Sequence, residues 1–574
     1  MLKKVRTLVP EIYPFVYQCY ASSSSLFFGE NYTIQSQEGV QQGDPLGPFL
    51  FSLATMDLVN SCQSELKIFY LDDGTLGGDL ETVLNDYKSI QASATSLGLE
   101  VNPTKCELFE INPSPNNSDN AYLKFCEAST GQCKVKLLSD HDLTLLGAPI
   151  LPAAIESVLN KKLEDLKLMT DRLTEIDAHE ALFLLRHCFS IPKMTYVLRT
   201  SPCFMENLIL KNYDDLIKSA LQKILNISLS EEPWNQCTLP INLGGLGLKM
   251  ASEVSLPAFL SSAFGAVQIV KALLPLCIKD ETNQFFELGC AKWKVKLNCD
   301  TLPSNQLFQS EWDKPLYFQR HKNILDTVPS SIERARILGI TAEHASDFLH
   351  AIPMANLGLK LADSELRVIC ATRLGAPLCN QHKCSCGAEV DPMGRHGLSC
   401  KNQVGRHPRH SNVNDLVKRA LSSADIPSRL EPQGLSRKDG KRPDGMTLFP
   451  YKEGRCLVWD VTVVDTLACS HIKDTAKSPG AAATKAEKIK FAKYEEIKKS
   501  YHMIPIAIET FGAWGPEGLS FIKNIGQKIK QLTGNKRSTF FLFQSISMAI
   551  QRGNAASILG TVKSGKKLDE IYYL

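Results

Sequence analysis

The sequence predicts an α+β protein of several domains, and three observations lead to this fold class. The chain has 574 residues, several times the length of a typical single domain. Strand-like runs that end in or follow turns occur at residues 68–74 and 444–464, whereas residues 151–375 have a helical pattern. A content of 44% hydrophobic and 22% charged residues is that of a globular chain.

Two adjacent carboxylates, Asp72 and Asp73, lie between the strand-like run Ile68–Leu71 and the turn residue Gly74. This pattern predicts a β-hairpin with both carboxylates at its tip. There, both side chains can reach one divalent cation, and their hard oxygen ligands suit Mg²⁺. An isolated Asp-Asp-Gly sequence is most often a solvated turn, so the functional interpretation depends on the neighbouring motifs.

Further motifs lie on both sides of this hairpin. The upstream motif consists of Gln42, Gly43, Asp44 and Pro45. It predicts a tight turn into a helix, with Asp44 as the N-cap and Pro45 at the first helical position. Downstream are the stretches Leu97–Cys106 and Leu145–Gly147.

In order and spacing, these motifs resemble the palm of reverse transcriptases, with its template motif, catalytic hairpin and primer grip. The resemblance implies an RNA-directed DNA polymerase in which Asp72 and Asp73 are catalytic and hold Mg²⁺ or Mn²⁺. It also implies that the upstream motif binds template and nucleotide, and that Lys105 faces the leaving pyrophosphate. A plain surface lysine at position 105 is an equally good interpretation. Residues 1–150 are then a partial palm, and DNA and RNA are its partners.

Two-metal phosphoryl transfer also needs a third carboxylate, which in the resembled family lies on a strand upstream of the template motif. No Asp occurs before Asp44, and the earlier acids Glu11, Glu30 and Glu38 do not lie on a plausible central strand. We therefore expect the chain to begin inside a polymerase domain, without the fingers and the first catalytic aspartate. We also expect the polymerase to be inactive in the chain as written.

The middle of the chain predicts helices. Residues 151–230 place leucines at helical intervals and resemble the helical thumb of the same family. Residues 231–375 predict a further helical linker region, with Trp293 and Trp312 in a core. No window approaches the 18 uninterrupted apolar residues of a membrane span, so we expect no membrane partner.

A cluster of soft metal ligands follows this helical region, with the spacing Cys384, Cys386, His396 and Cys400. Three thiolates and one imidazole at short spacing predict a four-ligand Zn²⁺ site in a knuckle at 376–410. Cys379 and His382 are rival ligands. With the basic segment that follows, which includes His410 and Asn414, the cluster resembles the Cys-Cys-His-Cys knuckle of non-LTR retrotransposons of the restriction-like-endonuclease class.

Two more carboxylates, Asp444 and Asp460, are separated by fifteen residues, and Asp460 lies inside the strand-like run Cys456–Val464. Asp460 and Thr462 share a strand face, which is the arrangement of an Asp-x-Lys site whose lysine is replaced. A hydrolytic two-carboxylate site also needs a cation near the attacked phosphate.

The next helix offers that cation. Lys490 and Tyr494 lie one turn apart on one helical face, with Lys493 beside them. This resembles a PD-(D/E)xK nuclease core, an α/β fold, in which the lysine has moved from the strand to the helix. The resemblance implies an endonuclease at 411–535, with Asp444 and Asp460 holding Mg²⁺ or Mn²⁺ and Lys490, Lys493 and Tyr494 in catalytic roles. A solvated helix face is the alternative for any single lysine.

Charge is unevenly distributed along the chain. Residues 401–574 hold 29 Lys and Arg against 16 Asp and Glu, whereas residues 1–400 hold 35 against 45. A basic C-terminal module suits nucleic acid, and residues 536–574 are predicted as an apolar helix followed by a basic C-terminal tail.

The whole pattern favours a non-LTR retrotransposon-type protein, intracellular and nuclear. Two alternatives stay open from the sequence: a non-catalytic nucleic-acid-binding protein, and a gene remnant without function.

Overall fold

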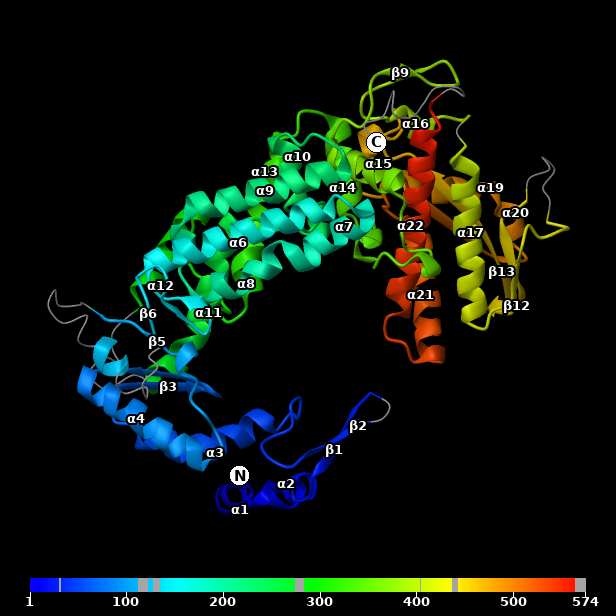
Figure 1. Ribbon diagram of the computed structural model, residues 1–574. Coiled ribbons are helices and arrows are strands. Elements are labelled where there is room, and N and C mark those ends of the chain that lie inside the picture. Colours follow the sequence, from blue (N-terminus) through cyan, green and yellow to red (C-terminus); the bar gives the residue numbers. More distant parts are fainter. Residues whose placement is uncertain are drawn as a thin grey trace. The chain divides into compact units, whose positions relative to one another are not determined.

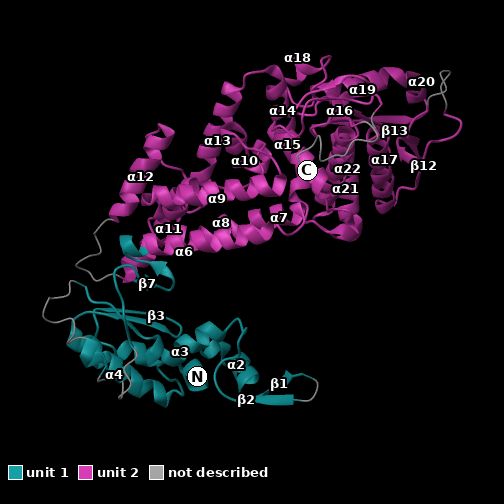
Figure 2. Ribbon diagram, turned by 45° about the horizontal axis from the view of Figure 1, so that its top comes forward, with its two compact units in different colours: residues 1–154 teal, residues 155–574 magenta. Residues whose placement is uncertain are grey.

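The computed structural model describes residues 1–29, 32–111, 122–126, 135–273, 283–402, 404–435 and 442–562 (Figure 1). The chain divides into two compact units, unit 1 at Met1–Ala154 and unit 2 at Ile155–Leu574 (Figure 2). Both units mix helices and strands, so the predicted α+β class is confirmed.

Unit 1 combines helices with two-stranded sheets. Its main elements are α1 (Leu2–Leu8), α2 (Tyr13–Tyr20), β1 (Ser24–Phe28), β2 (Tyr32–Ser36), α3 (Gly47–Ser61), β3 (Leu66–Tyr70), β4 (Asp73–Gly77), α4 (Leu80–Ser96), β5 (Glu107–Leu108), β6 (Lys136–Leu137), β7 (Thr144–Leu145) and β8 (Ala148–Pro149). Strands β3 and β4 pair antiparallel with Tyr70 opposite Asp73, which confirms the predicted hairpin.

The start of helix α3 corrects one expectation. The sequence pattern predicted Asp44 at the N-cap and Pro45 at the first helical position. In the structure α3 begins at Gly47, and Leu46 is its N-cap. The Asp44 carboxylate accepts from the Leu46 N–H at 2.9 Å, and the Asp44 carbonyl accepts from the Gly47 N–H at 2.9 Å. Asp44 therefore closes a turn before the helix instead of capping it.

The first part of unit 2 is helical, as predicted for residues 151–375. Its helices are α6 (Pro152–Leu173), α7 (Ala178–Leu184), the π-helical turn η3 (Leu185–Phe189), α8 (Ile191–Thr200), α9 (Asn207–Leu225), α10 (Glu231–Cys237), α11 (Ala251–Leu273), α12 (Gln284–Leu297), α13 (Gln309–Thr327), α14 (Ser331–Thr341) and α15 (Asp363–Leu374). Trp293 and Trp312 pack edge to face in a buried cluster, as expected.

The second part of unit 2 contains strands and helices. Its elements are β9 (His382–Lys383), β10 (Glu389–Val390), α16 (His396–Ser399), α17 (Arg406–Ser423), β11 (Ser428–Leu430), β12 (Gly445–Lys452), β13 (Arg455–Val464), α18 (Ile472–Thr475), α19 (Ala481–Lys493), α20 (Glu495–Lys498), β14 (His502–Glu509), α21 (Pro516–Thr533) and α22 (Ser538–Leu559).

One hydrophobic core connects these two parts. It runs from Ile155 in α6 through Leu398 in α16 to Ile558 near the end of α22. The segments that the sequence analysis treated as thumb, linker, knuckle and nuclease therefore pack within one compact unit.

A four-stranded sheet in the order β11-β12-β13-β14 organises the second part. Strands β13 and β14 are parallel, and the other pairs are antiparallel. Trp459 and Val461 point into the core made by α17, α21 and α22, whereas Asp460 faces α19 on the opposite side. This period-two alternation lets β13 bury an apolar face and still present a carboxylate.

Helix α22 lies in the segment at 536–574 that was predicted as an apolar helix followed by a basic C-terminal tail. It packs beside α17 and α21 (Figure 1) and also contacts α15 and α16. Most of its side chains are buried, including the polar Gln551 and Asn554. Ser538–Leu559 is the apolar helix that was expected in this segment, and it completes the core. Residues 563–574, the Lys-rich end, lie outside the described residues.

Helix α11 is long and apolar enough to cross a membrane by length and composition, which the sequence analysis did not expect. Its first half, Ala251–Ser261, is mostly buried against its neighbours in unit 2. Buried core helices of globular proteins pass the same test, so this property alone is weak evidence for a membrane span.

Candidate functional site

The β3–β4 hairpin exposes both predicted catalytic carboxylates of unit 1. Leu71 and Asp72 form the two-residue turn of the hairpin, and the Leu71 φ of 58° is left-handed. Asp73 is the first residue of β4. Among the described residues, no third Asp, Glu, His or Cys joins this pair closely enough to form a three-ligand metal site. The hairpin can therefore offer two carboxylates to a cation.

A buried acid fixes the chain just before this hairpin. Asp86 on α4 accepts hydrogen bonds from the backbone N–H groups of Gln63 at 2.8 Å and Ser64 at 2.7 Å, and from the Ser64 hydroxyl at 2.6 Å. Burial acts to raise the pKa of Asp86, but these hydrogen bonds outweigh it and hold the pKa below its usual value.

The other predicted residues of unit 1 lie in turns. The Tyr20 hydroxyl donates to the Asp44 carboxylate and lowers the pKa of Asp44. Gln42, Gly43 and Pro45 belong to the same stretch before α3, and the Gly43 φ of 91° favours glycine. Lys105 ends a short 3₁₀ turn, Pro103–Lys105, and is exposed to solvent.

In unit 2, the four predicted metal ligands come together. The Sγ atoms of Cys384, Cys386 and Cys400 and a ring nitrogen of His396 all lie within 4.8 Å of one another. The turn between β9 and β10 brings the first two cysteines together: the Gly387 N–H donates to the Cys384 carbonyl at 2.9 Å, and Gly387 has a φ of 92°. The cluster could hold a metal ion.

The rival ligands point elsewhere. The Cys379 thiol faces the carbonyls of Asp391 at 3.5 Å and Pro392 at 3.6 Å. The His382 ring nitrogens lie 2.9 Å from the Asn380 carbonyl and 2.9 Å from the Thr561 hydroxyl. Both side chains are thus occupied by polar partners outside the cluster.

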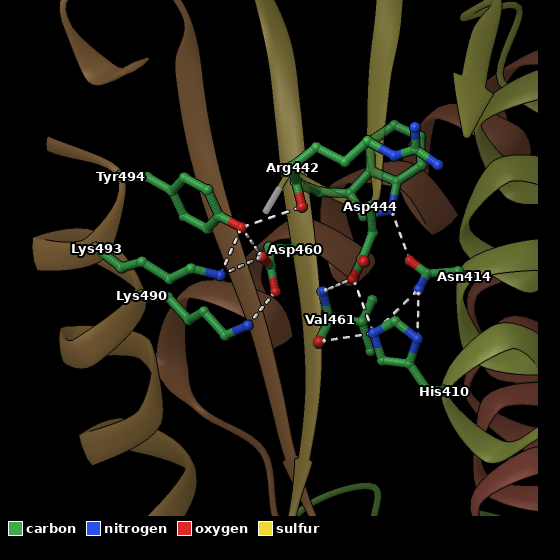
Figure 3. Close-up of polar contacts among 10 residues, drawn as sticks. His410, Asn414, Arg442, Asp444, Asp460, Val461, Lys490, Lys493 and Tyr494 are labelled. Atoms are coloured by element: carbon green, nitrogen blue, oxygen red, sulfur yellow. Dashed lines mark hydrogen bonds and ion pairs between the residues drawn. The ribbon is translucent and has the colours of Figure 1, made fainter. Parts of the chain in front are cut away.

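Around Asp460, helix α19 brings three side chains to one buried carboxylate (Figure 3). Lys490 donates to one carboxylate oxygen, and the buried Tyr494 hydroxyl donates to the other. Lys493 donates to the Tyr494 hydroxyl at 2.8 Å, and its Nζ atom lies 3.8 Å from Asp460. The arrangement neutralises a carboxylate that is only 3% exposed.

Asp444 lies just before β12 and has different partners. Its Oδ2 atom accepts from the Val461 N–H at 2.6 Å and lies 3.0 Å from His410 Nε2. Burial acts to raise the pKa of Asp444, but the hydrogen bond and charge of His410 and the Val461 N–H hold the pKa below its usual value. The Asp444 hydrogen bond in turn raises the pKa of His410.

The two aspartates thus lie on neighbouring strands but face different helices. In Figure 3, Asp460 points toward Lys490 on α19 and Tyr494 just after it, and Asp444 lies on the other side of β13, toward His410 on α17.

Two residues at this site were missed by sequence reasoning. His410 and Asn414 on α17 lie next to Asp444 and were interpreted only as part of a basic segment. His410 Nε2 also lies 3.1 Å from the Val461 carbonyl, and Asn414 Nδ2 lies 3.4 Å from His410 Nδ1. Their spacing of four residues, one helical turn, was the signal that could have indicated a shared face.

Comparisons with known proteins agree with the sequence motifs. Residues 3–150 match the family model for reverse transcriptase, an RNA-dependent DNA polymerase. Over 422 residues the chain is 22% identical to the retrotransposable element SLACS 132 kDa protein of Trypanosoma brucei gambiense, which covers 72% of this chain and 30% of that protein. The chain thus spans less than a third of that relative's length. Residues 3–150 therefore form a reverse transcriptase domain, and the chain is related to a protein of retrotransposable elements.

Proposed function

We propose that this chain is a reverse transcriptase-related retrotransposon protein of the restriction-like-endonuclease class, and that unit 2 is a metal-dependent DNA endonuclease. The observation that supports it best is the meeting of Lys490, Lys493 and Tyr494 at the buried Asp460, with Asp444 on the next strand. A buried acid surrounded by cations and a phenol, at the junction of a strand and a helix, is a group of residues suited to phosphodiester hydrolysis.

Asp444 and Asp460 are the residues proposed to supply ligands to a divalent cation, although in this structure their carboxylates face different helices. Their donor atoms are carboxylate oxygens, which suit Mg²⁺ and Mn²⁺. When bound, such an ion polarises the phosphate and lowers the pKa of an attacking water.

The protein side chains have separate roles in this proposal. Lys490 forms an ion pair with Asp460 and offers a positive charge for the phosphate. Tyr494 holds the Asp460 carboxylate in a fixed orientation, and Lys493 orients the Tyr494 hydroxyl. The basic sequence of residues 401–574 supports binding of the DNA backbone.

We further propose that the polymerase is inactive in these 574 residues by themselves. The sequence has no Asp before Asp44, and the described residues add no third ligand to Asp72 and Asp73. Two-metal phosphoryl transfer with only two carboxylates lacks one bridging ligand. We propose that Lys105 faces the leaving pyrophosphate of the reverse transcriptase reaction. We propose that Gln42, Gly43, Asp44 and Pro45 contact template and nucleotide.

For the cluster of Cys384, Cys386, His396 and Cys400 we propose one structural Zn²⁺. Three thiolates and one imidazole are the ligands of a closed zinc site, and their mutual distances fit a single ion. From the proposal that the chain is a retrotransposon protein, we also propose DNA and RNA as its partners and the nucleus as its location.

A second candidate function is nucleic-acid binding without catalysis. One observation favours it: each aspartate already has protein partners, Asp460 the Lys490 ammonium and Asp444 the His410 ring and the Val461 N–H. Incubation of the full chain with supercoiled duplex DNA and Mg²⁺ or Mn²⁺ separates the two functions. The nuclease proposal expects nicking that Asp444→Ala abolishes while salt-dependent DNA binding is retained. Binding without nicking in the unmodified chain would favour the second function.

A further inference from the structure

We propose that His410 is a positioning residue of the nuclease site, which holds the Asp444 carboxylate and the Val461 carbonyl together so that Asp444 can receive a divalent cation. The role given to His410 rests on the proposed endonuclease function. The evidence for it is the set of contacts around one ring nitrogen. His410 Nε2 lies 3.0 Å from Asp444 Oδ2 and 3.1 Å from the Val461 carbonyl oxygen.

The protonation of this nitrogen follows from its neighbours. A carboxylate oxygen and a carbonyl oxygen can only accept hydrogen bonds. A lone pair on Nε2 would face two acceptors at contact distance, so Nε2 carries the proton and donates to both. His410 therefore acts on a cation through Asp444 and not as a ligand.

Asn414 connects the ring to the core, since its Nδ2 atom lies 3.4 Å from His410 Nδ1 and 3.5 Å from Nε2. The Trp459 indole N–H donates to Asn414 Oδ1 at 3.0 Å, so the Asn414 amide group turns its NH₂ toward His410. Trp459 and Asn414 are both buried. The series Trp459, Asn414, His410 and Asp444 links the core beneath the sheet to the acid of the site. Figure 3 shows its last three members.

The residue after Asp444 makes this series possible. A Cβ atom on Gly445 would lie 2.0 Å from the Trp459 ring, so the indole packs directly on the backbone of β12. Only glycine permits this approach, which places the indole N–H within reach of Asn414.

Helix α17 itself is anchored next to His410. The Arg409 guanidinium donates to Asn554 Oδ1 on α22 at 2.6 Å, and Asn554 Nδ2 donates to the Thr510 carbonyl at 2.6 Å. Because Arg409 and Asn554 are buried, the helix cannot shift along its axis without breaking these bonds. The imidazole is thus held at both its backbone and its ring.

The test is Mn²⁺ binding by the full chain, measured by electron paramagnetic resonance of free Mn²⁺. The parent chain and all variants carry Asp72→Ala, which weakens Mn²⁺ binding at the β3–β4 hairpin. His410→Ala should raise the dissociation constant for Mn²⁺ about 10- to 100-fold, the usual effect of losing a group that orients a metal ligand. DNA binding measured without metal should stay within about twofold.

Two matched variants separate positioning from a general loss of structure. His410→Gln keeps an N–H donor and should restore Mn²⁺ binding to within a few-fold of the parent chain. Trp459→Phe removes only the far indole donor of the series, and a smaller, few-fold weakening is expected. If His410→Ala unfolds the chain, these two variants still decide the matter.

Four outcomes would overturn the proposal: Mn²⁺ binding unchanged by His410→Ala, His410→Gln as damaging as His410→Ala, Trp459→Phe without any effect, or no Mn²⁺ binding in the parent chain. Failure of the endonuclease function has a different result, since a chain that binds Mn²⁺ in a His410-dependent way but never nicks DNA would refute only the catalytic claim.

Discussion

Substitution of Lys490 by methionine should destabilise the region around Asp460 by about 2–3 kcal/mol. Methionine keeps most of the aliphatic chain, so the change removes mainly the charge. The side chains of Lys490 and Asp460 are 20% and 5% exposed, so they form a largely buried pair. Removing one partner of such a pair costs about 3–5 kcal/mol. We lower this value because Asp460 keeps the Tyr494 hydroxyl and the Lys493 ammonium at 3.8 Å.

Hydrogen exchange of β13 amides, measured by mass spectrometry, reports this change where it occurs. A loss of about 2–3 kcal/mol corresponds to about 30- to 150-fold faster exchange if these amides open by the affected local or global unfolding. The matched control is Lys485→Met on the same helix, because Lys485 is exposed and should change exchange by less than about threefold. Equal effects of the two substitutions would refute the assigned role of Lys490. The same comparison in a nicking assay should show Lys490→Met as the more damaging change.

The remaining predictions concern other parts of the chain. Primer extension with Mg²⁺ or Mn²⁺ should give no product, and robust extension that Asp72→Ala abolishes would disprove the proposed inactivity. Elemental analysis should find one zinc per chain, lost in Cys386→Ser but kept in Cys379→Ser, whose thiol faces carbonyls; equal zinc in both variants would exclude the assigned ligands. Burial lowers the pKa of His179 to about 4, so the folded state disfavours its protonation, and stability that is full above about pH 6.5 should fall by up to about 3 kcal/mol toward pH 4. Urea midpoints should show this loss in the parent chain and a smaller one in His179→Gln, and parallel pH profiles would contradict it.

Local sequence patterns predicted several elements well. Asp72 and Asp73 lie between a strand-like run and a glycine, and a strand followed by turn residues is sufficient to predict a hairpin. The meeting of Cys384, Cys386, His396 and Cys400 was similarly predictable, because these four residues are close in sequence. On α19, the spacing of Lys490 and Tyr494 defined a shared face, which the structure directs at Asp460.

Features that depend on distant packing were missed. His410 lies 34 positions before Asp444, and no local pattern indicates that α17 crosses the start of β12. Helix α22 was expected only as an apolar helix before the basic chain end, and the sequence did not indicate that its buried Gln551 and Asn554 bond to the Thr510 carbonyl. The start of α3 was placed at Pro45, since the sequence does not reveal that Asp44 closes a separate turn.

The measurement that tests the central claim most directly is the single-turnover nicking rate of supercoiled DNA by the full chain in Mn²⁺. The unmodified chain should nick, and Asp460→Asn, which keeps the side-chain volume and an acceptor for Tyr494, should reduce the rate by about a thousandfold or more while DNA binding is retained. An unmodified chain that binds DNA without nicking it, or nicking that survives both Asp444→Ala and Asp460→Asn, would contradict the assignment of an endonuclease to this site.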